Sequence, residues 1–311
     1  MAALSSQLLD RAQAAYLGLA IGDALGATTE FMTVREIECA HGKHKDIVGG
    51  GWLKLQPGQV TDDTEMTLAL GQAIVDEQSI KAPAIAEAFS EWMRSKPADI
   101  GHTVRRGISH YRQTGRPFVE PNEHDAGNGA CMRCLPIALA CHNDNDAVLS
   151  EASKLQAHIT HNTEVADAGT ETVLRMIVAA LHEAALPELR MFADELVSEY
   201  PEFRFDKKRV ENPCGWIVET LRTVFQAIFE NDSFEDTLVD VVNRGGDADT
   251  TGAIAGMIVG AYYGTEAIPT RWWNKLPPEI YTQCLQQAEE LLSLAEKPEI
   301  ELSAEKLNGG I

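Results

Sequence analysis

Apolar side chains recur at helical spacing along almost the whole of this 311-residue chain, and this pattern limits the fold more than any other feature. In Leu68–Val75 they follow a Thr-Asp-Asp-Thr segment that is typical of a helix start. Two runs of strand-forming residues, Ile47–Val48 and Phe203–Phe205, are too short to build a sheet. The same helical spacing predicts further helices at Ile85–Met93, Val104–Tyr111, Val165–Leu181, Ile217–Phe229 and Ile280–Leu294. The sequence therefore predicts an all-α fold.

Glycine and proline separate these helices without forming a long linker, and no repeat of fixed period is present. This organisation favours one domain over two. We predict a single compact multi-helix domain over residues 1–295. The polar segment over residues 296–311 is expected to be a flexible C-terminal tail.

The N-terminal segment is interpreted as an amphipathic helix and not as a signal peptide. It has no basic region ahead of its apolar stretch, and Asp10 and Arg11 interrupt it. The apolar stretch at Ala253–Tyr263 is too short and too rich in glycine to span a bilayer. Cys131 and Cys134 have C-x-x-C spacing without a second pair, so buried, reduced thiols are favoured over a metal or redox pair. These features predict a cytoplasmic protein without direct membrane insertion.

The chain carries 26 basic and 47 acidic side chains, for a formal net charge of −21. This charge would repel phosphates, so we expect neither a nucleic-acid partner nor binding to anionic lipid. It would instead attract cations. Most of the acidic residues lie in helical stretches such as Glu183–Glu202 and Glu279–Glu301, where they are expected to be solvated surface.

Two segments far apart in the sequence concentrate carboxylates and hydroxyls where a loop leads into an apolar helix. One interpretation is N-capping, because such groups accept hydrogen bonds from the free amides of a helix start. The other is a site for Mg²⁺ or Mn²⁺, which prefer these oxygen donors. The residues alone leave both open. The candidate ligands are Thr61, Asp62 and Asp63 in the first segment and Asp247, Asp249 and Thr250 in the second.

Several weaker signals accompany these segments. The glycine-rich loop that follows Asp125 leads into a helix and could hold a diphosphate on its amides, although a simple turn explains it equally well. His158 and His161 lie three residues apart without an acidic third ligand, which favours a structural or ligand-contacting role over zinc. Taken alone, Asp99 is best explained as a cap for the helix that follows it.

In combination, these segments resemble the ADP-ribosylglycohydrolase family, and especially its bacterial branch. The resemblance runs from about Ala12 to Ala295 and leaves out the tail. The landmarks, in chain order, are GLAIGDALGATTEFM, GGGWLKLQPGQVTDDTEMTLALG, DAGNGACMRCLP, HITHN and NRGGDADTTGAIAGMIVGAYYG. The TDDT and GGDADTTGA segments are the specific ones, and the sequence does not depart from the family pattern at them.

The resemblance implies an all-α fold with a binuclear Mn²⁺ or Mg²⁺ centre in a cleft, held by the six candidate ligands. It implies that Asp99 and Glu30 are the acid/base candidates, with Asp99 facing the substrate ribose and Glu30 beside the metals. Members of the family release ADP-ribose from modified arginine by cleaving its N-glycosidic bond. The substrate-binding residues that it implies are Asp125, Gly127, Asn128, Gly129 and His161.

The partner implied by the bacterial branch is dinitrogenase reductase, the nitrogenase iron protein, in its ADP-ribosylated form. A regulatory PII-type protein is a further implied partner. Two alternatives remain at this level. The same fold and metals could serve another ADP-ribosylated protein or metabolite, or the chain could be a non-catalytic binding or structural member of the family.

Overall fold

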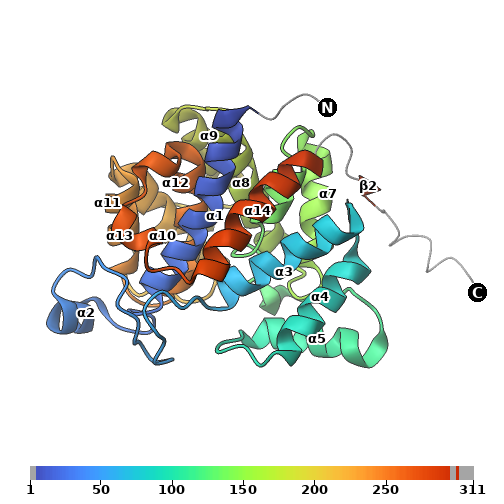
Figure 1. Cartoon of the computed structure of the whole chain (residues 1–311), viewed down its shortest axis with the longest axis horizontal. Helices are drawn as coiled ribbons and strands as arrows, with labels where there is room; N and C mark the ends of the chain where they lie inside the picture. Colours follow the sequence, from blue (N-terminus) through green and yellow to red (C-terminus); the bar gives the residue numbers. More distant parts are fainter. Residues whose placement is uncertain (1–4, 295–298, 301–311) are drawn as a thin grey trace, which may run out of the picture.

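The structure, a computed structural model, describes residues 5–294 and 299–300 and confirms the predicted helical class (Figure 1). Every range predicted from apolar spacing lies in a helix, although α3 begins at Asp62, well before the apolar run. The helices are α1 (Ser6–Gly26), α2 (Val34–His41), α3 (Asp62–Glu77), α4 (Ala82–Arg94), α5 (His102–Thr114), α6 (Leu135–Ala140), α7 (Asp146–Ala157), α8 (Glu164–Leu181), α9 (Leu186–Glu199), α10 (Ile217–Glu230), α11 (Phe234–Val242), α12 (Ala248–Tyr263), α13 (Thr270–Trp273) and α14 (Pro278–Leu294), with 3-10 turns η1 (Glu123–Asp125), η2 (Pro201–Phe203) and η3 (Thr265–Ala267).

The only strands among the described residues are β1 (Ser79–Ile80) and β2 (Glu299–Ile300), which pair in parallel. Their shortness agrees with the absence of strand patterns in the sequence. This pair joins two residues of the predicted tail to the segment between α3 and α4. The rest of the tail lies outside the described residues, so its boundary and flexibility stay predictions.

Helix α1 differs from the amphipathic helix that the sequence predicted, because it is buried on all sides from Ala14 to Gly26. It runs through the middle of the molecule, with α12 on one side and α14 on another (Figure 1). Small side chains allow this position, since alanine and glycine occupy much of its surface. The prediction was wrong because Asp10 and Arg11 lie only in its first turns and say nothing about the remainder.

Glycines spaced four residues apart bring α1 and α12 into backbone contact, the most extensive helix pair in the described part of the chain. A Cβ atom added to Gly22 would lie 2.0 Å from the carbonyl oxygen of Gly252, and one added to Gly256 would lie 2.0 Å from that of Gly18. Side chains at these positions would therefore force the helices apart. Helix α12 is apolar and buried, but no helix within the described residues combines the length and hydropathy that crossing a bilayer requires.

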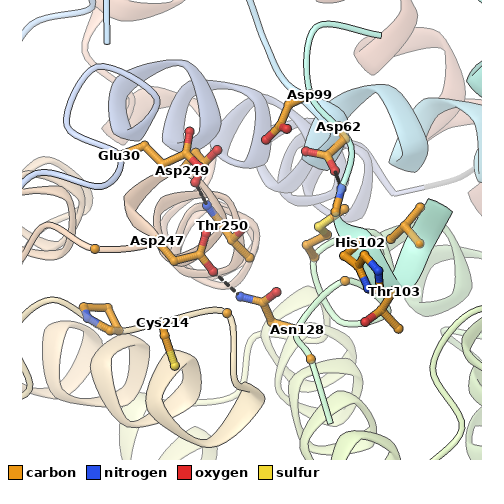
Figure 2. Close-up of a pocket in the computed structure, with 18 of the residues that line it drawn as sticks. Glu30, Asp62, Asp99, His102, Thr103, Asn128, Cys214, Asp247, Asp249 and Thr250 are labelled. Atoms are coloured by element: carbon orange, nitrogen blue, oxygen red, sulfur yellow. Dashed lines mark hydrogen bonds between the residues drawn. The ribbon is translucent and has the colours of Figure 1, made fainter. Parts of the chain in front are cut away.

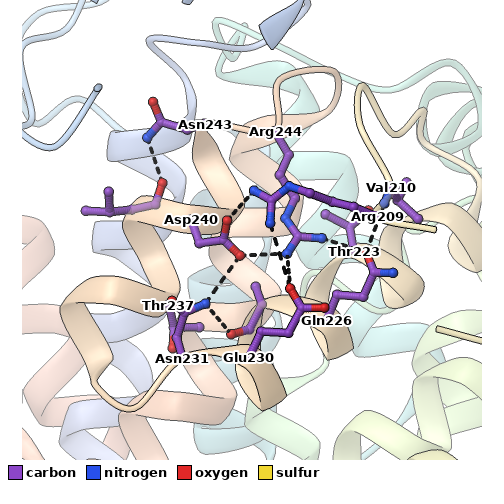
Figure 3. Close-up of polar contacts among 12 residues, drawn as sticks. Arg209, Val210, Thr223, Gln226, Glu230, Asn231, Thr237, Asp240, Asn243 and Arg244 are labelled. Carbon is purple, nitrogen blue, oxygen red and sulfur yellow. Dashed lines mark hydrogen bonds and ion pairs between the residues drawn. The ribbon is translucent and has the colours of Figure 1, made fainter. Parts of the chain in front are cut away.

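A buried arginine anchors the loop that leads into α12 (Figure 3). Arg244 donates hydrogen bonds to Gln226 at 2.7 Å and to Asp240 at 2.6 Å, and Arg209 forms a second ion pair with Asp240. Although burial opposes ionisation, these two arginines lower the pKa of Asp240 below its ordinary value. The network fixes the backbone immediately before the second acidic segment.

Candidate active site

The start of α3 is held by a carboxylate from another helix. Asp23 of α1 accepts hydrogen bonds from the backbone N–H groups of Thr61 at 3.0 Å and Thr64 at 3.1 Å. Both threonine hydroxyls donate to the same carboxylate. Thr61, the residue before the helix, makes no capping bond with its own side chain. Asp23 therefore takes over the capping role, which leaves Asp62 and Asp63 free of it.

The start of α12 depends on a glycine pair that lets another loop approach closely. Gly245 and Gly246 have φ angles of +69° and +64°, in the left-handed region that favours glycine. A Cβ atom on Gly245 would lie 2.1 Å from the carbonyl oxygen of Met32. Gly246 exchanges backbone hydrogen bonds with residues 31 and 32. This pairing brings Glu30 beside the beginning of α12.

The two helix starts meet at Asp63. Its Oδ2 atom accepts a hydrogen bond from the hydroxyl of Thr250 at 3.4 Å and lies 3.2 Å from the hydroxyl oxygen of Thr61, whose hydrogen goes to Asp23. Segments 187 residues apart in sequence therefore share one carboxylate. A neighbouring acidic group has carboxylate oxygens within 4.8 Å of one another and consists of Glu30, Asp247 and Asp249.

Capping hydrogen bonds do not account for these paired aspartates. Asp247 precedes α12 but makes no capping bond with its side chain. Its carboxylate instead accepts a hydrogen bond from Nδ2 of Asn128 at 2.5 Å (Figure 2). Oδ1 of Asp249 accepts a hydrogen bond from the N–H of the adjacent residue, Thr250, at 2.9 Å. Of the two interpretations that the sequence left open, the geometry favours ion binding.

Burial and mutual repulsion make these carboxylates costly to ionise. Burial raises the pKa of Asp63 above its ordinary value, and the charge of Asp23 adds to the effect. Burial likewise raises the pKa of Asp249, with Glu30 adding to it. The Oδ1 atom of Asp63 is buried and has no hydrogen-bond partner within the described residues. Such an oxygen is unfavourable unless a positive group approaches it.

The donor set fits a divalent cation of the Mg²⁺ or Mn²⁺ type. The candidate ligands are carboxylate and hydroxyl oxygens, which hard cations prefer to imidazole and thiolate. A cation among them would offset the repulsion that raises their pKa values. The structure therefore contains an acidic group that can hold a divalent cation.

A cavity of about 600 Å³ opens beside this acidic group, a size typical of sites for small molecules. Figure 2 shows Glu30 and Asp249 on one side of the view and Asp62 and Asp99 on the other. The pKa of Asp62 is raised by burial and then by the charge of Asp99. Asp99 is partly exposed and accepts a hydrogen bond from the next backbone N–H at 2.7 Å. Helix α5 begins three residues later, after Gly101, so Asp99 is not its N-cap.

Glu30 is held by a tryptophan that the sequence did not single out. The indole N–H of Trp52 donates to Oε2 of Glu30 at 2.5 Å, and the Trp52 ring lies 5.3 Å from that of Phe31. Burial raises the pKa of Glu30 to about 8. The hydrogen bond from Trp52 opposes this rise, whereas the charges of Asp247 and Asp99 add to it. Trp52 is half exposed at the cavity edge, so it limits where the Glu30 carboxylate can lie.

Replacing Trp52 with phenylalanine should lower kcat for ADP-ribose release about tenfold, because it removes the hydrogen bond that holds the Glu30 carboxyl and keeps the ring contact. Steady-state kinetics would measure the change. Trp92→Phe is the matched control, since the Trp92 indole donates to Glu65 at 2.8 Å and neither residue lines the cavity. Equal activity of the two variants would contradict a role for Trp52 in positioning Glu30.

The predicted substrate loop, Gly127–Gly129, forms part of the cavity wall. The amide of Asn128 donates to Thr220 at 2.9 Å as well as to the acidic group, which fixes its orientation. His161 packs against the loop, so that a Cβ atom on Gly129 would lie 2.7 Å from Cε1 of its ring. The loop therefore needs small residues to accept the imidazole.

Asp125 takes a different place from the one expected. Its buried carboxylate is paired with Arg106 and accepts a hydrogen bond from Asn122 at 3.1 Å. It does not line the cavity, and neither do the buried residues Thr61 and Asp63. The substrate contact predicted for Asp125 thus finds no support in this geometry, and the residue instead fixes the approach to the loop.

Two further sequence features prove structural. Nε2 of His158 lies 2.9 Å from a carboxylate oxygen of Asp167, so His158 does not form a site with His161. Cys131 and Cys134 are both buried, as predicted, and form no disulfide in the described structure; their reduced state stays a prediction.

Sequence reasoning gave no role to Asp23 or Trp52. Asp23 had a signal, because an aspartate between Gly22 and Gly26 in an otherwise apolar helix is unusual. Trp52 had none: it follows three glycines in a loop, and its contact with Glu30 exists only in three dimensions.

Comparison with known proteins gives concordant results. The family model described as ADP-ribosylglycohydrolase matches residues 4–302. The chain belongs to the ADP-ribosylglycohydrolase family. It is 45% identical over 286 residues to an ADP-ribosyl-[dinitrogen reductase] glycohydrolase of Rhodospirillum rubrum, covering 92% of this chain and 97% of that protein.

Two further relatives of this glycohydrolase family extend the comparison. An ADP-ribosylarginine hydrolase Tri1 of Serratia proteamaculans is 30% identical, covering 87% of this chain and 76% of its own length. A solved structure titled ADP-ribosylglycohydrolase-related protein complex superposes with a TM-score of 0.83 at 31% identity, covering 93% of this chain and 99% of its own. The chain is thus a hydrolase of the ADP-ribosylglycohydrolase fold, and the resemblance seen in the sequence is confirmed.

Proposed function

We propose that this chain removes ADP-ribose from a modified arginine of dinitrogenase reductase by hydrolysing the N-glycosidic bond. The observation that carries the proposal is the acidic group of Glu30, Asp247 and Asp249 at the cavity, next to the place where two helix starts meet at Asp63. The 45% identity and nearly complete overlap with the Rhodospirillum rubrum protein support the choice of protein substrate. The name of the Serratia relative supports the arginine linkage.

We further propose that two divalent cations bind here. The carboxylates fall into two neighbouring sets, one around Asp63 and one that includes Asp247 and Asp249, and this division suits two ions better than one. When bound, the ions would supply Lewis acidity and orientation for the ribose hydroxyls and a water molecule. The ligands that we propose are Thr61, Asp62, Asp63, Asp247, Asp249 and Thr250.

The remaining chemistry falls to residues of the cavity wall. Hydrolysis joins a water oxygen to the anomeric carbon, breaks the carbon–nitrogen bond and returns a proton to the departing guanidine. Asp99 is partly exposed in the wall and can stabilise positive charge on the anomeric carbon or move a proton. Glu30, held by Trp52, is the second acid/base candidate. The Gly127–Gly129 loop and His161 would bind the ADP-ribose.

Release from arginine-ADP-ribosylated dinitrogenase reductase is expected in Mn²⁺ and is expected to fall to background in a chelator. Free ADP-ribose would be measured by chromatography, with serine-ADP-ribosylated protein tested in parallel. Mn²⁺ restored after chelation should restore release, which controls for denaturation. Release from serine but not from arginine would overturn the proposal and favour the same fold acting on another modified protein. Binding of ADP-ribose without release from either substrate would favour the non-catalytic alternative.

The cytoplasmic location and the PII-type partner stay predictions. Mn²⁺ and Mg²⁺ both accept this oxygen-rich set of ligands.

A further inference from the structure

Arg133 is completely buried near the cavity and forms no ion pair within the described residues. Its guanidinium donates to the side chain and backbone oxygens of Gln156, both at 2.9 Å, and to the hydroxyl of Thr160 at 2.8 Å. It also lies 4.4 Å from the centre of the Phe89 ring. Burial lowers the pKa of Arg133 to about 9, so the group remains a cation at neutral pH and acts only as a donor.

The Arg133 bond decides what the Thr160 hydroxyl can do. Because arginine only donates, the oxygen of Thr160 accepts, and its own hydrogen needs another acceptor. Within the described residues, the partner in reach is Nδ1 of His161, at 2.8 Å. Thr160 is fully buried, and leaving its hydrogen unpaired would be unfavourable. The hydroxyl therefore donates to Nδ1, which must be unprotonated.

The state of Nδ1 fixes the other ring nitrogen of His161. Burial, and then the charges of Arg133 and Arg106, lower the pKa of His161 to about 3, so the ring is neutral at physiological pH. A neutral imidazole with an accepting Nδ1 carries its proton on Nε2. The Nε2 edge faces the substrate loop: a Cβ atom on Gly127 or on Gly129 would lie 3.1 Å from it.

We propose that Arg133 and Thr160 are positioning residues that hold His161 as its Nε2–H tautomer, so that the cavity presents a neutral N–H donor to an acceptor oxygen of ADP-ribose. The inference rests on the proposed function for the identity of the ligand, but not for the tautomer. A ring free to exchange tautomers would spend part of its time presenting a lone pair and would repel that oxygen. The backbone supports the arrangement, because the N–H groups of Thr160 and His161 both donate to the carbonyl of Ala157.

The tautomer can be read directly from the ring nitrogens. Two-bond ¹H–¹⁵N correlation spectra of the ligand-free full chain, loaded with diamagnetic Mg²⁺, distinguish a protonated Nε2 from a protonated Nδ1. The His161 signals are assigned by their absence from His161→Gln. We expect the Nε2–H form in the wild type and in Thr160→Ser, which keeps the hydroxyl. Thr160→Val, of equal shape but without the hydroxyl, should show Nδ1–H or a mixture of the two.

Binding of free ADP-ribose, measured by calorimetry, gives the second readout. Thr160→Val should raise Kd about tenfold and raise KM with little change in kcat, whereas Thr160→Ser should stay near the wild type. Thr223→Val is the matched control, because Thr223 is a fully buried helical threonine outside the cavity lining whose hydroxyl donates to the Glu219 carbonyl at 2.7 Å. Thr160→Ala serves if Thr160→Val does not fold.

Each outcome bears on a separate step. A wild-type ring protonated on Nδ1, or an unchanged tautomer in Thr160→Val, overturns the role of Thr160. A changed tautomer with unchanged Kd overturns the contact between His161 and ADP-ribose. If the wild type shows Nε2–H but releases no ADP-ribose from any substrate, the proposed function fails while the tautomer assignment stands.

Discussion

Asp63→Asn should abolish ADP-ribose release, with a loss of at least about a thousandfold, and should make the metal-free protein more stable. Activity should fall because Asp63 joins the two helix starts and is a proposed metal ligand. A bound metal contributes several kcal/mol to such reactions. The gain follows because Asp63 is a buried carboxylate close to Asp23, Asp62 and Asp247, with one oxygen unpartnered in the described structure. Removing its charge should raise the free energy of unfolding by about 1–3 kcal/mol in chelator.

Activity, Mn²⁺ titration calorimetry and chemical unfolding in chelator measure these effects of Asp63→Asn. Asp240→Asn is the contrasting variant, because Asp240 is a largely buried aspartate paired with Arg209 and Arg244. It should lower stability with or without Mn²⁺, since it leaves buried Arg244 without its nearest carboxylate. Wild-type affinity of Asp63→Asn for Mn²⁺ would refute the ligand assignment. A lower stability in chelator would refute the argument from crowded charge.

Gly256→Ala should destabilise the whole fold by about 3 kcal/mol, the upper part of the range for overpacked cores. The added Cβ atom would lie 2.0 Å from the carbonyl oxygen of Gly18, and backbone atoms cannot turn aside as a side chain can. Helices α1 and α12 would have to separate, which would also move Asp23 away from the aspartates at the start of α12. We therefore expect weaker Mn²⁺ binding together with the lower free energy of unfolding.

Gly169→Ala in α8 is the matched control for Gly256→Ala. Its added Cβ atom would meet only side chains, at 2.9 Å from Ile217 and from Leu221, and these can shift. Alanine also gains about 1 kcal/mol over glycine in a helix interior, which offsets part of any crowding at both positions. Urea unfolding of the two variants would compare them directly. Similar losses would show that backbone contact between α1 and α12 is not what makes Gly256 necessary.

The sequence determined the fold class and most helix positions. Apolar residues at a period near 3.6 are a local property, so ranges such as Val165–Leu181 and Ile217–Phe229 could be predicted within a residue or two. Family landmarks carried the prediction further, to the hydrolase family and to six candidate ligands. Helix α7, the short helices and the burial of α1 were not predicted, because they depend on what packs around them.

The arrangement of the site belongs to the tertiary structure. Periodicity shows that Asp62 and Asp247 each lie at a helix start, but capping and metal binding use the same residue types, so the pattern alone left both open. The structure favours metal binding over capping because Asp23 of α1 already caps α3, and because Asp247 accepts a hydrogen bond from Asn128 and makes no capping bond. The indole of Trp52 on Glu30 and the chain from Arg133 through Thr160 to His161 are likewise contacts between distant segments.

The charge of the chain gives the same lesson. The net charge of −21 can be counted from the sequence, but the count does not separate acidic residues on the solvated surface from those in the buried group. The buried carboxylates differ from the others because α1 and α12 approach closely enough to remove water from between them. Sequence determines which ionisable groups exist. Only packing decides which of them lose water, and it is the loss of water that shifts their pKa values and suits them to bind a cation.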